Sequence, residues 1–146
     1  MFRGRFAHTI DAKGRVSIPA SFRVELQEHD ERPPFLTNLP RCLALYPSDQ
    51  WLEIEERVAN LSQIRPEVQA YQRFLVSGAQ PCPIDRQGRM LVPPTLREHA
   101  SLEREVIIAG VGPRIEMWDR ERFDEELRLT IERSDEISSV LADLGL

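Results

Sequence analysis

The stretch IDAKGRVSIPASFR, residues 10–23, returns as IDRQGRMLVPPTLR at residues 84–97, an offset of 74 positions. Six of the fourteen aligned residues are identical, and both stretches follow the pattern I-D-x-x-G-R-h-x-h-P-x-[ST]-h-R, where h is apolar. A second correspondence follows at an offset of 72, where Leu43, Leu45, Tyr46 and Trp51 align with Ile115, Met117, Trp118 and Phe123. A long pattern that recurs at a nearly fixed interval indicates a tandem duplication.

Each copy of the pattern contains a turn followed by a short strand. The aspartate of Asp-x-x-Gly can accept hydrogen bonds from the backbone ahead of it, and the glycine supplies a positive φ. Val16 and Ile18 alternate with more polar residues, which is typical of a half-buried strand. We therefore expect a β-hairpin with the motif at its tip. Pro19 and Pro93 are then placed to open a short helix.

Two more extended segments and an amphipathic helix follow in each copy, so that each half has the order β-β-α-β-β-α. Ser48 and Asp119 are the expected N-caps of the two amphipathic helices. Neither half alone has enough strands to bury both faces of a sheet. We therefore expect an α+β fold in which the duplicated halves pair about a pseudo-twofold axis and close into a small β-barrel with flanking helices.

The duplication divides the chain into four expected parts. These are a first repeat at residues 5–52, a helical linker at 53–80, a second repeat at 81–124 and a C-terminal helical tail at 125–146. The tail carries an apolar stripe with no place in the barrel, formed by Ile137, Val140, Leu141 and Leu144. This stripe is a candidate surface for self-association.

Charge is distributed unevenly along the chain. The formal net charge is −5 and the isoelectric point is near 5.3, which argues against a uniformly basic protein that coats nucleic acid. Residues 1–24 nevertheless sum to +4 and residues 85–97 to +2, whereas residues 25–84 sum to −4 and residues 98–146 to −7. Two short basic segments in an acidic chain predict a focused anion-binding site.

Several other classes of protein lack support in the sequence. The N-terminus shows no signal peptide, and the longest apolar stretch, Val106 to Val111, is much shorter than a membrane span. We therefore expect a cytoplasmic protein that is not associated with a membrane. Cys42 and Cys82 are 40 positions apart without metal-ligand spacing, so we expect two buried, reduced thiols, no metal and no cofactor.

The duplicated aspartates, Asp11 and Asp85, raise the possibility of a proton-sharing catalytic dyad in an acid hydrolase. Such dyads need small neighbours, typically D-[ST]-G, but the next residues here are Ala-Lys and Arg-Gln. A role within the turn is favoured for both aspartates. The chain also has no G-x-S-x-G and no H-E-x-x-H motif, so we expect no enzymatic activity.

The arginines after the turns, Arg15 and Arg89, are the favoured binding residues. A β-hairpin with exposed arginine can enter the major groove of DNA, where the guanidinium reads guanine while neighbouring cations meet phosphates. The candidate neighbours are Lys13, Arg86, Arg3 and Arg5. The last residues of the pattern, Arg23 and Arg97, lie on the predicted helices and are expected to extend along the surface or to pair with Glu25 and Glu98.

The opening Met1-Phe2-Arg3-Gly4, the duplicated D-A-K-G-R and D-R-Q-G-R turns, and L-A-L-Y-P followed by Trp51 together resemble the MraZ family, bacterial proteins with two SpoVT/AbrB-like domains. The resemblance implies a swapped-hairpin-type (AbrB-like) barrel completed within one chain and assembly into ring-shaped oligomers. It also implies binding to repeated DNA elements upstream of the cell-division and cell-wall gene cluster, where family members act as transcriptional regulators, generally repressors. The D-x-x-x-R positions of the family fall on Asp11 with Arg15 and on Asp85 with Arg89.

Together with this resemblance, the basic turns predict a nucleoid-associated, sequence-specific regulator that binds double-stranded DNA, including its own promoter, as a homo-oligomer. Arg15 and Arg89 are the expected main contacts, with Lys13, Arg86, Arg3 and Arg5 in support. The residues expected to shape the turns are Asp11, Gly14, Asp85 and Gly88. The alternative is a non-catalytic scaffold for protein interactions, in which the hairpin arginines are structural.

Overall fold

The computed structural model describes residues 1–146, and its secondary structure repeats one order of elements twice. The first half contains β1 (Phe2–Thr9), β2 (Arg15–Ser17), α1 (Ala20–His29), β3 (Phe35–Asn38), β4 (Leu43–Tyr46) and α2 (Ser48–Ala59). The second half contains β5 (Gln80–Pro81), β6 (Arg89–Leu91), α4 (Pro94–His99), β7 (Glu105–Gly112), β8 (Arg114–Asp119) and α5 (Arg120–Glu132). Between the halves lie α3 (Pro66–Tyr71) and a π-helix, η1 (Gln72–Val76), and α6 (Ser134–Asp143) ends the chain.

Strands from the two halves are interleaved in the antiparallel sheet, since β1 pairs with β7, β4 with β8 and β3 with β5. The pairs β3–β4 and β7–β8 each lie within one half. The six-stranded sheet has the order β1-β7-β8-β4-β3-β5, and β2 and β6 form a separate two-stranded ribbon. The counterparts of β1, β3 and β4 in the second half are β5, β7 and β8. Exchanging each strand for its counterpart gives the same six-stranded order, read from the other end of the sheet. The predicted α+β class is confirmed. The pairings leave β1 and β5 at the two ends of the six-stranded sheet.

The prediction of a simple hairpin at each motif is wrong. The strands before and after the first turn do not form a ladder with each other, since β1 pairs along all eight residues with β7 and β2 pairs with β6. Only the isolated bridges between Ile10 and Val16, and between Ile84 and Met90, connect the two sides of the turns. A long strand gains more hydrogen bonds from an equally long partner than from the three residues of β2.

The main hydrophobic core lies on the face of the sheet that α1, α4 and the ribbon cover. Val16 and Met90 point inward from the ribbon and are almost completely buried. Phe22 of α1 packs edge-on against Phe2 and Phe6 of β1, with ring centroids 5.6 and 5.2 Å apart. Through these contacts, α1 and the ribbon pack against the same side of β1.

A smaller core covers the opposite face of the sheet beneath α5. It consists of the buried residues Cys42, Ile107, Ala109, Trp118 and Phe123. The free thiols of Cys42 and Cys82 are both buried, and this burial raises their pKa values to about 12 and about 11. Both thiols therefore stay protonated near neutral pH.

The two predicted N-caps have different outcomes. The Asp119 carboxylate accepts a hydrogen bond from the backbone N–H of Arg122 at 3.1 Å, as expected of the residue that caps α5. The prediction for Ser48 is wrong, because α2 begins at Ser48 itself and Pro47 holds the cap position. Helix α2 continues to Ala59 and therefore extends from the expected first repeat into the expected linker.

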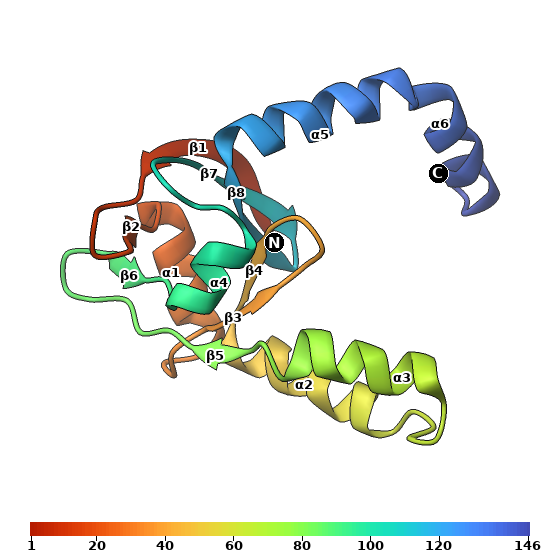
Figure 1. The fold of residues 1–146 in the computed structure, drawn as a ribbon, viewed down its shortest axis with the longest axis horizontal. Helices are drawn as coiled ribbons and strands as arrows, with labels where there is room; N and C mark the ends of the chain where they lie inside the picture. The colour runs from red at the N-terminus through yellow and green to blue at the C-terminus, as the bar shows by residue number, and fades with distance from the viewer.

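Figure 1 shows the two motif turns projecting from one side of the molecule, next to β2 and β6. The helical pairs α2–α3 and α5–α6 extend from the other side as two separate arms. None of the helices has the length and apolar character needed to cross a bilayer. The turns and the arms thus form two separate parts of the molecular surface.

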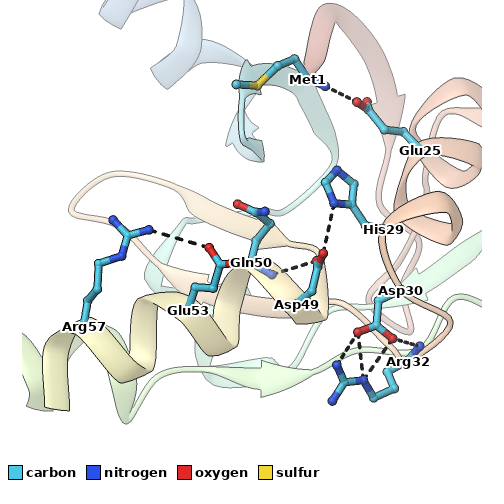
Figure 2. A network of polar contacts seen from close by, with 9 residues as sticks. All are labelled: Met1, Glu25, His29, Asp30, Arg32, Asp49, Gln50, Glu53 and Arg57. Carbon is cyan, nitrogen blue, oxygen red and sulfur yellow. Dashed lines mark hydrogen bonds and ion pairs between the residues drawn. The ribbon is translucent and has the colours of Figure 1, made fainter. Parts of the chain in front are cut away.

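A set of polar contacts holds α1 in place (Figure 2). The amino group of Met1 donates to the carboxylate of Glu25 in α1. At the end of the same helix, Nδ1 of His29 lies 3.4 Å from the carboxylate of Asp49 in α2. Both contacts join α1 to distant parts of the chain and help to fix its orientation relative to the sheet.

Candidate nucleic-acid interface

Asp11 organises the first turn through both of its carboxylate oxygens. Oδ1 accepts hydrogen bonds from the backbone N–H groups of Lys13 and Arg15, at 3.0 and 2.9 Å, and Oδ2 accepts from Arg15 Nε at 2.7 Å. Gly14 closes the turn by donating its N–H to the Asp11 carbonyl at 3.0 Å. Its φ of +89° favours glycine at this position.

The second turn repeats this arrangement around Asp85. Oδ1 accepts from the backbone N–H groups of Gln87 and Arg89, at 2.8 and 3.0 Å, and Oδ2 lies 3.3 Å from Arg89 Nε. Gly88 donates to the Asp85 carbonyl at 2.9 Å and has a φ of +78°. Asp11, Gly14, Asp85 and Gly88 thus occupy the positions that a turn-shaping role requires.

The turns lower the pKa values of both aspartates. The backbone N–H of Arg15 is the largest cause of the lowered pKa of Asp11, and the Arg15 guanidinium adds to it. The backbone N–H of Arg89 has the largest effect on the pKa of Asp85. A proton-sharing dyad needs one carboxyl group with a raised pKa. Both carboxylates are instead ionised and engaged within their own turns.

The two turns interlock through the ribbon. The backbone N–H of Ile18 donates to the carbonyl of Gly88, and that of Val92 donates to the carbonyl of Gly14, both at 2.8 Å. Arg15 stands directly opposite Leu91 in the ribbon. Each turn is therefore held by the strand end of the other half, so the two motifs form one unit.

The outward face of the ribbon carries both duplicated arginines. Because Val16 and Met90 point into the core, the alternating residues Arg15, Ser17, Arg89 and Leu91 face away from it. Arg15 and Arg89 are diagonal neighbours across the two strands, which places their backbones roughly 7–8 Å apart. Each side chain is 32% exposed. The structure thus joins on one surface two arginines that the sequence assigned to separate hairpins.

The helix arginines Arg23 and Arg97 lie against the turns of the opposite half, a contact that the sequence reasoning missed. A Cβ atom on Gly88 would lie 2.6 Å from a terminal nitrogen of Arg23, and one on Gly14 would lie 3.3 Å from a terminal nitrogen of Arg97. Glu25, an expected partner of Arg23, instead binds the N-terminal amine. The internal repeat could have indicated an equivalent role for Arg23 and Arg97, because both arginines occupy the last position of the repeated pattern.

The remaining predicted cations fall into two groups. Lys13 and Arg86 are exposed at the turn tips, beside Arg15 and Arg89. Arg3 and Arg5 lie on β1, away from the turns.

Arg5 pairs with Ala109 of β7, whose side chain belongs to the small core under α5, and the Arg5 guanidinium carbon lies 5.6 Å from the ring centroid of Phe123. Arg3 is two residues earlier on β1 and therefore shares this face. The structure does not bring Arg3 and Arg5 to the turns, because their face of β1 is opposite the one that packs against the ribbon.

The cationic surface formed by the two turns and the ribbon contrasts with the rest of the chain. Residues 10–23 and 84–97 together carry a net charge of +4, while the remaining residues carry −9. Much of the acidic charge belongs to α2 and α5, which extend away from the turns (Figure 1). An anionic polymer is therefore attracted to the turns and repelled by the helical arms.

Comparison with known proteins identifies relatives over the whole chain. The chain is 44% identical to the transcriptional regulator MraZ of Alkaliphilus oremlandii, with both chains covered completely. It is 39% identical to the transcriptional regulator MraZ of Syntrophobacter fumaroxidans, over 99% of this chain and 97% of that protein. It is 40% identical to the protein of the same name from Moorella thermoacetica, again over the full length of both.

The model of the MraZ protein family, which is described as antitoxin-like, matches residues 1–74 and then residues 75–138. The two consecutive matches follow the internal duplication found in the sequence. By these matches, and by the duplicated turns that the fold brings together, the chain belongs to the MraZ family.

Proposed function

We propose that the chain is a non-catalytic, sequence-specific DNA-binding transcriptional regulator that inserts the β2–β6 ribbon into the major groove. The names of its relatives support a role in transcription. The observation that carries the proposal is the presence of Arg15 and Arg89 on one outward face of a two-stranded ribbon, an element that the major groove can accommodate.

The turn geometry prepares both arginines for this contact. Only Nε of each guanidinium is hydrogen-bonded within the protein, to Asp11 in one turn and to Asp85 in the other. The terminal nitrogens remain available for O6 and N7 of guanine, the commonest specific contact of arginine with DNA. A side chain that is already oriented loses less conformational entropy when it binds.

Two other cations complete the proposed interface. Lys13 and Arg86 contact phosphates beside the bases that the ribbon reads. Arg3 and Arg5 lie on the opposite face of β1, beneath the acidic helix α5, and are not part of the proposed interface. Because each contact neutralises few phosphates, binding to repeated DNA elements gains strength from several linked subunits.

The resemblance described for the sequence supports the finer parts of the proposal. The first part is a ring-shaped homo-oligomer of chains that each form a swapped-hairpin barrel. The second part is the division of the chain into repeats at 5–52 and 81–124, a linker at 53–80 and a tail at 125–146. The regulator acts in the cytoplasm at the nucleoid, as a repressor of the cell-division and cell-wall gene cluster that includes its own promoter.

A salt series tests DNA binding directly. The full-length chain is titrated with the DNA upstream of its own gene and with a scrambled duplex of the same composition, at several salt concentrations. With Lys13 and Arg86 of at least two linked subunits on phosphates, at least four cations take part. We then expect the logarithm of the binding constant to fall with the logarithm of the salt concentration with a slope of roughly −4 or steeper, and the preference for the natural sequence to persist. Weak salt dependence without a sequence preference would instead support the scaffold for protein interactions.

The tail provides a separate test of assembly. Val140 and Leu144 of the tail are 55% and 73% exposed, so this part of the apolar stripe is largely uncovered within the chain. We expect Val140→Asp combined with Leu144→Asp to shift the protein toward its 16.9 kDa monomer in sedimentation velocity. Ser138→Asp combined with Ser139→Asp adds the same charge to the tail, outside the apolar stripe, as a control. An unchanged oligomer in the first variant would exclude this stripe from the subunit interface.

A further inference from the structure

Leu91 is an exposed apolar residue on the outward face of the cationic ribbon, at the end of β6. It is 57% exposed and stands directly opposite Arg15, while Arg89 lies two residues before it on the same strand and the same face. Its Cδ1 lies 3.7 Å from the position that a Cβ on Gly14 would occupy, so the side chain rests against the first turn. Leu91 therefore belongs to the surface that the proposed function brings to DNA.

The matching position of the first half holds Ser17, so the two sides of the ribbon differ where they would meet the bases. The turn tips differ as well, with Ala12-Lys13 in the first and Arg86-Gln87 in the second. A symmetric protein reads a palindromic site, because the DNA must present the same groups to both halves. The outward face of this ribbon is instead polar on one side and apolar on the other.

A single exposed leucine is common on protein surfaces and needs no special role. The position of Leu91 is more specific, because it is next to both arginines suited to the major groove, to Arg15 across the ribbon and to Arg89 along β6. The apolar group that the major groove offers is the C5-methyl of thymine, and side-chain methyl groups recognise it by direct contact. Arg15 and Leu91 are about 5 Å apart across the strands, close to one or two base-pair steps of about 3.4 Å.

We propose that Leu91 contacts the methyl group of a thymine one or two base pairs from the guanine bound by Arg15, and that this contact gives the recognised DNA element a direction. The proposal rests on the proposed function, since it requires that the ribbon enters the major groove. Ser17, on the other side of the ribbon, accepts or donates a hydrogen bond at the equivalent step and does not distinguish thymine by its methyl group.

Replacement of thymine by deoxyuridine tests this contact, because it removes only the C5-methyl. Each thymine of the bound upstream element is replaced in turn, and affinity is measured for the full-length protein and for Leu91→Ser, which copies the residue of the first half. We expect one substitution to weaken binding by the unaltered protein about fourfold, the effect of losing one buried methyl group. Leu91→Ser should show no loss at that position.

Val24→Ser is the matched control, because Val24 is equally exposed, at 56%, but lies on α1 outside the ribbon. This variant should keep the sensitivity to deoxyuridine. If no thymine replacement weakens binding, or if Leu91→Ser stays as sensitive as the unaltered protein, the assignment of Leu91 is wrong. A variant lacking both Arg15 and Arg89 separates this assignment from the proposed function. If that variant loses DNA binding, the proposed function stands even when Leu91 makes no thymine contact. If that variant binds DNA unchanged, both the proposed function and the role of Leu91 are wrong.

Discussion

Replacing Arg15 and Arg89 together with alanine is expected to lower affinity for the upstream DNA by roughly 100-fold or more. Each bidentate contact between arginine and guanine contributes about 1–3 kcal/mol of discrimination, and about 1.4 kcal/mol corresponds to a factor of ten. The loss should be much smaller for scrambled DNA, since these two side chains read bases. The measurement is a titration by fluorescence anisotropy with both duplexes at one fixed salt concentration.

A control for charge uses Arg57 and Arg128, two exposed arginines of the helical arms. Their joint replacement with alanine removes the same formal charge from α2 and α5, and should leave the affinity within about twofold. Thermal unfolding of both double variants monitors folding. If the Arg15 and Arg89 variant folds normally and still prefers the upstream DNA as strongly as the unaltered protein, the ribbon is not the reading element.

Gly110→Ala is expected to destabilise the fold by about 3 kcal/mol, the upper end of the cost of overpacking a core. Gly110 of β7 pairs with Gly4 of β1, and a Cβ there would overlap the backbone nitrogen of Arg3 and lie 2.6 Å from its Cα. Backbone atoms cannot rotate away as a side chain would. The start of β1 would have to leave β7 and withdraw the buried ring of Phe2 from the core.

For a chain of this size, such a loss corresponds to a decrease in melting temperature of about 10 °C. Val111→Ala is the matched control, because Val111 is the next residue of β7 and its side chain is partly exposed near the end of that strand. It should lower the melting temperature by no more than about 3 °C. A Gly110→Ala protein as stable as this control would show that β1 can be displaced at little cost.

The conformations of the two turns could be predicted from the sequence because their determinants lie within five residues. An aspartate that accepts bonds from the backbone ahead of it and a glycine with positive φ are both visible in D-A-K-G-R and D-R-Q-G-R. The repeated order of elements followed from hydrophobic periodicity in the same way. Local signals of this kind placed Arg15 and Arg89 correctly on short strands after the turns.

The strand partners could not be predicted in this way, because pairing joins segments distant in sequence that carry no mark of one another. β1 was expected to fold back on β2, but it pairs with β7. The position of Arg3 and Arg5 depends on this pairing. Alternation along a strand places Arg3 and Arg5 on one face of β1. That this face lies under α5 follows only from the pairing of β1 with β7. The contacts of Arg23 with Gly88 and of Arg97 with Gly14 arise from the same exchange between halves.

The pairing of β1 with β7 also has a consequence for biosynthesis. Residues 2–9 leave the ribosome first, but their partner at residues 105–112 follows about 100 residues later. At about 5–20 residues per second, the first strand waits roughly 5–20 s with its backbone groups unpaired and Phe2 and Phe6 uncovered. During this interval it can pair with the same strand of a neighbouring nascent chain. Two positively charged arginines within β1 oppose such pairing, because like charges on adjacent strands repel.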